Sequence, residues 1–180
     1  MDELKIYSIR DEYIEYLKRY NSKIYSNKRE SRVHSRKYLG VVIQVADYQY
    51  CIPLSSPKKT DYQRAGNGYV IKKSIVPIIR IVVKNSNGER ELKGTLRISH
   101  MIPVPESELE LYDLENEQDE AYKDLVQNEM IFIRKNSNKI IANANLLYRQ
   151  KAMDEQVATY LESVLDYKSL EKLCDAYVYQ

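Results

Sequence analysis

Apolar residues in the first hundred positions recur in short runs, which are typical of β-strands. Turn residues separate the runs: Ala46-Asp47 predicts one hairpin, and the sequence NSNG at 85–88 predicts another. Closely spaced antiparallel strands of this kind favour an SH3-like, partly open β-barrel. The predicted strands are residues 4–9, 38–45, 48–54, 76–83, 91–98 and 101–104.

Other parts of this half do not follow the strand pattern. Tyr13, Tyr16, Leu17 and Tyr20 recur at helical spacing, which predicts a short N-terminal helix. Residues 21–37 are basic and lack an apolar period, so they predict a long loop. Residues 60–74 are polar and contain two glycines, and they predict a second, mobile loop.

The second half changes character after residue 105. Residues 106–120 contain eight acidic residues and no basic one. Apolar positions then recur at helical spacing, which predicts three or four helices packed on the barrel. The fold class is therefore α+β, in a single domain over 1–180 with a basic barrel part (1–105) and an acidic helical part (106–180). The apolar positions are Ala121, Leu125, Met130, Ile133, Ile140, Ala144, Leu147, Leu170, Leu173, Cys174 and Tyr177.

Charge separates the same two parts. The chain has 180 residues and a net charge of +2, but residues 1–100 carry +10 and residues 101–180 carry −8. This asymmetry indicates a polyanionic partner for the first half, or one half docking on the other. No apolar run reaches membrane-spanning length, and the N-terminus does not resemble a secretory leader. With only two cysteines, we expect a cytoplasmic protein with reduced thiols and no membrane contact.

Aromatic usage is biased toward tyrosine. The chain has 17 Tyr, one Phe and no Trp, and ten of the tyrosines precede residue 71. Tyrosine fills a core while keeping a polar end, and it also stacks on unpaired bases. Tyr13, Tyr25 and Tyr62 are the candidates for stacking on RNA.

Two polar clusters lie at opposite ends of the first predicted hairpin. His34, Arg36 and Lys37 precede its first strand, whereas Ser55, Ser56, Lys58 and Lys59 follow its second. Since a hairpin brings the start of one strand beside the end of the other, we expect the clusters to meet at one edge of the barrel.

This set of side chains suits cleavage of RNA without a metal. RNA carries its own nucleophile, the 2′-OH, which the protein must orient and deprotonate while cations neutralise the phosphorane. The sequence contains no P-loop, GxGxxG, GxSxG, HxxxH or CxxC pattern, so we predict no cofactor and no metal. The same residues also fit ordinary solvated turns, which is the structural alternative for each of them.

Several segments resemble the ToxN/AbiQ family, the toxins of type III toxin–antitoxin systems. The sequence IPLSSPKK at 52–59 is similar to that family's PLTSPKK segment, and MIPVP at 101–105 is similar to its INNMIPVP region. The likeness extends to the N-terminal strand and helix, the entry to the first barrel strand, and the helical tail. These further matches are YSI at 7–9, YIEYL at 13–17, RKYLGVV at 36–42, GTL at 94–96, and Ile140, Ala144 and Tyr148.

The resemblance implies a metal-independent endoribonuclease toxin on an SH3-like barrel. Such a toxin leaves 2′,3′-cyclic phosphate and 5′-OH ends and acts in abortive infection against phage. Its antitoxin is a repeat RNA containing a pseudoknot, which the toxin cuts and then holds in a closed toxin–RNA assembly. Cellular or phage mRNA is the expected substrate.

The resemblance also assigns site residues. Ser56 matches the active-site serine, Ser55 replaces a threonine, and Lys58 matches a catalytic-region lysine. Arg36 replaces another lysine, and a guanidinium holds phosphate charge but cannot act as a base. Position counting puts Arg32 at the family's active-site tyrosine, so we assign proton transfer to His34. The predicted RNA-binding residues are Lys59, Lys37, Arg32, Tyr13, Tyr25, Tyr62, Arg64 and Lys72.

Two other functions keep the same basic surface. One is a non-catalytic RNA-binding regulatory module in which Ser56 and His34 carry out no chemistry. The other is a barrel toxin neutralised by a protein. For the RNA-inhibited toxin, the acidic helical half is expected to stay away from the RNA and to pack against the barrel, and the separate role expected of His100 is structural.

Overall fold

The computed structural model describes residues 3–28, 33–155 and 158–178, which form an α+β fold. The helices are α1 (Asp11–Tyr20), α2 (Glu120–Ala152) and α3 (Tyr167–Val178). Short 3₁₀ turns are η1 (Lys59–Asp61), η2 (Ile98–His100), η3 (Glu106–Glu108) and η4 (Thr159–Ser163). The strands are β1 (Lys5–Ile9), β2 (Tyr38–Val45), β3 (Tyr48–Ser55), β4 (Tyr62–Ala65), β5 (Gly68–Ile71), β6 (Ile79–Lys84), β7 (Arg90–Leu96), β8 (Ile102–Pro103) and β9 (Leu109–Leu111).

One antiparallel sheet organises the molecule. Its strand order is β6-β7-β3-β2-β1-β9, and β8 also pairs with β3. The eight-residue β3 pairs with two different strands along one of its edges. Tyr50 and Cys51 pair with β8, whereas Leu54 and Ser55 pair with β7. The antiparallel sheet with its added helices confirms the predicted α+β class. In the part of the chain that the structure describes, no pairing joins β6 to β9, so no closed barrel forms.

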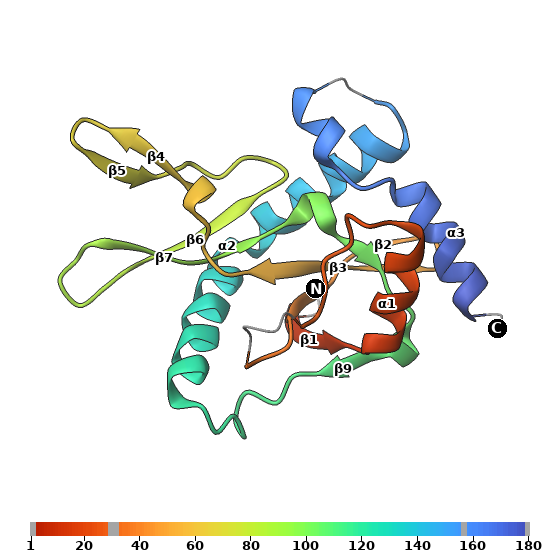
Figure 1. Cartoon of the computed structure of the whole chain (residues 1–180), viewed down its shortest axis with the longest axis horizontal. Coiled ribbons are helices and arrows are strands. Elements are labelled where there is room, and N and C mark those ends of the chain that lie inside the picture. Colours follow the sequence, from red (N-terminus) through yellow and green to blue (C-terminus); the bar gives the residue numbers. More distant parts are fainter. Residues whose placement is uncertain (1–2, 29–32, 156–157, 179–180) are drawn as a thin grey trace.

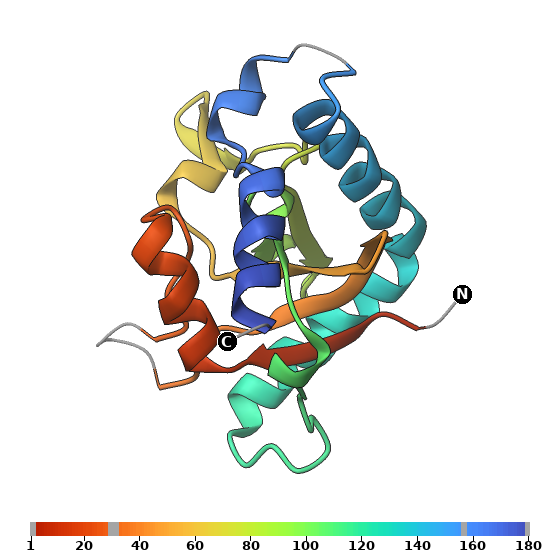
Figure 2. The same ribbon diagram turned by 90° about the vertical axis from the view of Figure 1, so that its right-hand side faces the viewer.

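The two helices from the C-terminal part of the chain pack against the sheet. Helix α2 packs against β2, β6 and β7, and α3 contacts β8. Figure 2 shows α3 lying between α1 and α2, and both neighbours contact it. Tyr13, Tyr16 and Leu17 are buried, as the helical spacing of α1 predicts, whereas Tyr20 is exposed.

Helix α2 is one element of 33 residues, whereas the sequence favoured several shorter helices. The interval 134–139 is polar but contains no glycine or proline, so nothing ends the helix there. The buried positions on both sides of it continue one apolar stripe, including Met130, Ile133, Ile140 and Ala144. A polar interval is therefore a solvated stretch of one helix here.

Two segments in which the sequence predicted no strand contain strands. The expected mobile loop at 60–74 includes the β4–β5 hairpin, whose turn residue Gly66 has a φ of +58°. Figure 1 shows this hairpin and the β6–β7 hairpin extending from the same side of the molecule. The acidic segment contributes β9, which extends the sheet by pairing with β1. By contrast, residues 21–28 and 33–37 contain no helix or strand, as predicted.

Candidate active site

The two polar clusters meet where β2 begins and β3 ends, as the hairpin predicted. The backbone N–H of Leu54 donates to the carbonyl of Lys37 over 2.9 Å. Arg36 Nη1 donates to Ser55 Oγ over 2.8 Å and to the Leu54 carbonyl over 2.7 Å. Ser55 is buried, whereas Ser56 is exposed at the strand end. The sheet register therefore places a hydroxyl and a guanidinium beside the exposed serine.

Arg36 is buried, and its guanidinium is hydrogen-bonded to the protein. Only 4% of its surface is exposed, and its Nε donates to the Ser26 carbonyl over 3.2 Å. Its guanidinium carbon lies 4.7 Å from the centre of the Tyr25 ring. Because these contacts hold the cation in place, Arg36 provides a fixed positive charge and ties Tyr25 and Ser26 to the start of β2.

Tyr25 is the loop tyrosine that the structure brings to the site. Its ring stacks on His100 at 4.3 Å, and Lys58 Nζ lies 5.4 Å from its centre. Position counting pointed instead to Arg32, which lies outside the described residues. Residues 21–28 bring Tyr25 beside His100 and Lys58, which distance along the chain did not indicate.

His100 also lies beside the site, which the sequence did not predict. Ser99 Oγ and His100 Nδ1 are 2.9 Å apart. Burial, followed by the charges of Arg97, Lys58 and other cations, lowers the pKa of His100 to about 4. His100 is therefore neutral at pH 7. The chain has only two histidines, and this scarcity was the one signal that could have drawn attention to it.

A cavity of about 240 Å³ opens between this edge of the sheet and α2. His34 lies in it, with Nε2 3.0 Å from Asp119 Oδ2 and its ring stacked on Tyr122 at 3.8 Å. The hydrogen bond with His34 lowers the pKa of Asp119. The same carboxylate caps α2 by accepting from the Tyr122 N–H over 3.1 Å. The residues lining the cavity are Val33, His34, Ser35, Arg36, Lys37, Leu54, Ser55, Ser56, Lys93, Tyr122, Leu125 and Glu129.

The acidic half also lines the cavity, and its expected distance from the RNA stays a prediction. Tyr122, Leu125 and Glu129 of α2 line the cavity, and Asp119 holds the histidine. Helix α2 packs across β2, β6 and β7, which brings its N-terminal turns beside the end of β3. Lys93 of β7 is a further lining residue that the sequence did not suggest.

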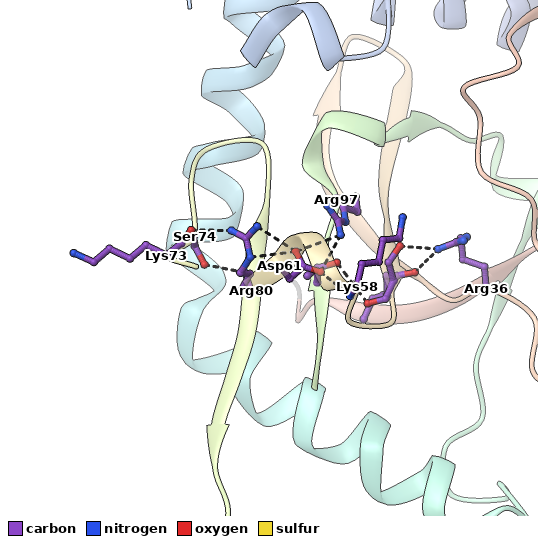
Figure 3. A network of polar contacts seen from close by, with 10 residues as sticks. Arg36, Lys58, Asp61, Lys73, Ser74, Arg80 and Arg97 are labelled. Atoms are coloured by element: carbon purple, nitrogen blue, oxygen red, sulfur yellow. Dashed lines mark hydrogen bonds and ion pairs between the residues drawn. The ribbon is translucent and has the colours of Figure 1, made fainter. Parts of the chain in front are cut away.

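Lys58 is held by a buried ionic network, shown in Figure 3. Its backbone N–H donates to Asp61 Oδ2 over 2.9 Å, and Asp61 is fully buried. Arg80 approaches Asp61 Oδ1 at 3.1 Å, and Arg97 approaches Oδ2 at 3.2 Å. Asp61 thereby ties the turn that carries Lys58 to β6 and to the end of β7.

The predicted RNA-binding residues differ in exposure. Lys59 and Arg64 are exposed, and Tyr62 and Lys72 are partly exposed around the β4–β5 hairpin. Lys37 is partly buried, and this burial lowers its pKa.

Tyr13 is a correction to the predicted RNA surface. It is fully buried, and its hydroxyl donates to the Pro103 carbonyl over 2.6 Å. Its ring also packs edge-on against Tyr177 at 4.9 Å. A ring enclosed in this way belongs to the core and does not stack on a base.

Two further features of the described residues bear on other functions. No helix in residues 3–28, 33–155 and 158–178 is long and apolar enough to cross a membrane. The same residues contain no group of three or more His, Cys, Asp or Glu side chains placed to hold a metal ion.

Fold and cavity together define an α+β protein with a cationic, histidine-containing site suited to a phosphodiester. Residues 5–175 match the family model described as Toxin ToxN, type III toxin–antitoxin system. The chain belongs to this family of endoribonuclease toxins. The resemblance inferred from the sequence is thereby confirmed.

Known relatives match almost the whole chain. Endoribonuclease AbiQ of Lactococcus lactis subsp. lactis is 31% identical over 174 residues, which cover 97% of this chain and 89% of AbiQ. A solved structure from work on a bacterial antiviral system regulated by a processed non-coding RNA has a TM-score of 0.76 and 25% identity. The match covers 93% of this chain and 95% of the solved one. Another solved structure, from work on selective toxin inhibition by a non-coding RNA pseudoknot, has a TM-score of 0.77 and 24% identity. The match covers 99% of this chain and 100% of the solved one.

Proposed function

We propose that this protein is a metal-independent, sequence-specific endoribonuclease that cleaves RNA by attack of the 2′-OH on the adjacent phosphodiester. The products carry 2′,3′-cyclic phosphate and 5′-OH ends. The observation that carries the proposal is the meeting of His34, Ser56 and the Arg36–Ser55 pair at one cavity. Family membership supplies the nuclease class, and these side chains supply the chemistry.

His34 takes the proton of the 2′-OH in this mechanism. Asp119 accepts the Nε2 hydrogen, which leaves Nδ1 as the proton acceptor and holds the ring in one orientation. The stack on Tyr122 restricts the ring further. A base that is held in place needs less reorganisation when the substrate binds.

The other residues stabilise the charge that develops on the phosphorane. The Ser56 hydroxyl donates to a phosphate oxygen, while Arg36 and Lys58 provide positive charge. Ser55 keeps the Arg36 guanidinium oriented, since its hydroxyl accepts from Nη1. The buried Arg36 guanidinium is already oriented, so it stabilises the transition state more than a mobile surface lysine does.

The antitoxin proposed for this chain is a repeat RNA with a pseudoknot, which the protein processes and by which it is inhibited. Support comes from the solved relative studied for toxin inhibition by a non-coding RNA pseudoknot. Lys59, Arg64, Lys72 and Tyr62 provide an accessible surface of cations and a ring around the β4–β5 hairpin. We further propose that toxin and RNA form a closed assembly in the cytoplasm. The substrate is cellular or phage mRNA, and the sheet has an SH3-like curvature.

Ser56→Ala tests the chemistry directly. Removal of one donor to the developing charge is expected to lower the cleavage rate by about 10²- to 10³-fold. Bacterial RNA is incubated with each protein in EDTA, and the ends are captured by a ligase that requires a 2′,3′-cyclic phosphate. Ser86→Ala is the matched control, because Ser86 is exposed in the β6–β7 turn.

Three results would count against the proposal. Wild-type activity that disappears in EDTA would contradict metal independence. Equal cleavage by Ser56→Ala would remove Ser56 from the mechanism. RNA that is bound but left intact by the wild type would favour the non-catalytic RNA-binding module.

A further inference from the structure

Glu129 is a buried carboxyl group in the cavity that the proposed mechanism leaves without a role. It lies on α2, only 8% of its surface is exposed, and it lines the same cavity as Ser56 and His34. An ionised carboxylate in this place would repel a phosphodiester. Packing alone therefore does not explain why a carboxyl group lies in this cavity.

The sheet leaves space for this side chain. A Cβ atom built on Gly94 of β7 would lie 2.6 Å from Glu129 Oε1 and 3.1 Å from the Ser55 carbonyl oxygen. The carboxyl group thus occupies the space beside Ser55 that any larger residue at position 94 would fill. Gly94 also lies next to the irregularity in the β6–β7 pairing at Ile81 and Val82.

The charged groups that face the cavity have other partners. Lys93 Nζ donates to Glu91 Oε1 over 2.9 Å, and Lys37 Nζ donates to the carbonyl and hydroxyl of Ser35. Arg36 and His34 are held by Ser55 and Asp119, as described above.

The Glu129 carboxyl group has no hydrogen bond or ion pair with residues 3–28, 33–155 or 158–178. Burial raises its pKa to about 7, and the negative charge of a bound phosphodiester would raise it further. With a pKa near neutrality, a large share of the Glu129 carboxyl groups carries the proton at pH 7 and can donate it to a substrate.

We infer that Glu129 is the general acid that protonates the leaving 5′-oxygen. This inference rests on the proposed ribonuclease function. As the 2′-oxygen bonds to phosphorus, His34 takes the 2′ proton, the P–O5′ bond breaks and its electron pair goes to O5′. The Glu129 proton passes to that oxygen to give the 5′-OH. His34 then loses its proton to solvent and Glu129 regains one.

Glu129→Gln tests this assignment, since the amide keeps the shape and cannot give up a proton to the alkoxide. The variant is expected to cleave an RNA carrying one known cut site about 10²-fold more slowly. The same RNA with sulfur in place of the 5′-bridging oxygen should restore cleavage to nearly the wild-type rate. A thiolate leaves without protonation because thiols are far stronger acids than alcohols.

The pH profile gives an independent measurement. Wild-type cleavage should fall as the pH rises above about 7, where the acid loses its proton, and Glu129→Gln should lack this fall. His34, Lys37, Lys93 and Tyr122 also face the cavity but remain unchanged in the variant. Asp124→Asn, at an exposed position of α2, is the control and should match the wild type in both measurements.

The outcomes separate this inference from the proposed function. Wild-type protein that forms no cyclic phosphate would overturn the ribonuclease mechanism itself. If the wild type cuts and Glu129→Gln cuts equally well, or stays slow on the sulfur-containing RNA, Glu129 is not the general acid. Circular dichroism of the variant and its affinity for the RNA with a 2′-deoxy residue at the cut site, both expected to equal the wild type, exclude misfolding.

Discussion

His34→Asn is expected to slow RNA cleavage by about 10²- to 10⁴-fold while leaving RNA affinity unchanged. Asparagine keeps a polar group near Asp119 but cannot accept the 2′ proton at neutral pH. His34 is held by Asp119 and Tyr122 rather than by core packing, so the fold should persist. The measurements are single-turnover cleavage and the Kd for an RNA with a 2′-deoxy residue at the cut site.

Two further variants make this prediction specific to proton transfer. Asp119→Asn should produce a smaller loss of rate, because it disturbs the tautomer and orientation of His34 but leaves the imidazole in place. Asp113→Asn removes another carboxylate of the acidic segment and should cleave like the wild type. If RNA affinity collapses in His34→Asn, the residue is an RNA contact rather than the base.

Asp61→Asn is expected to lower the free energy of unfolding by about 3–5 kcal/mol. The substitution leaves Arg80 and Arg97 buried without their carboxylate, and Arg97 Nε already lacks a partner among the described residues. It also weakens the acceptor that holds the Lys58 N–H, so cleavage should fall even where the protein is folded. Urea denaturation measures the first effect, and cleavage at low temperature measures the second.

A surface ion pair provides the comparison for Asp61. Arg10 Nε and Glu110 Oε1 are 3.2 Å apart, and both side chains are more than half exposed. Glu110→Gln should therefore lower the free energy of unfolding by no more than about 1 kcal/mol. Equal denaturation midpoints for Asp61→Asn and Glu110→Gln would show that the buried network contributes little to stability. Unchanged cleavage by folded Asp61→Asn would show that Lys58 does not need this support.

Predictions for the fold succeeded where neighbouring residues decide the structure. The β2–β3 hairpin follows from two β-rich runs on either side of Ala46-Asp47, and the β6–β7 hairpin follows from its NSNG turn. The strand β9 was missed because it is defined by pairing with β1, about a hundred residues away along the chain. The continuity of α2 was missed because its polar interval resembles a linker until the packing on both sides is known.

The sequence by itself determined the part of the site that one hairpin brings together. The strand register of β2 and β3 requires Arg36 to meet Ser55 and places Ser56 at the exposed strand end, since antiparallel pairing is a local constraint. Only the tertiary structure decided that Tyr25, Asp119 and Glu129 join them. Their approach depends on how a long loop and a 33-residue helix pack across the sheet, which is set by the summed burial of many distant side chains. In our proposal, the basic half thus contains the residues that bind the phosphate, whereas the acidic half supplies the carboxylates that orient the base and protonate the leaving group.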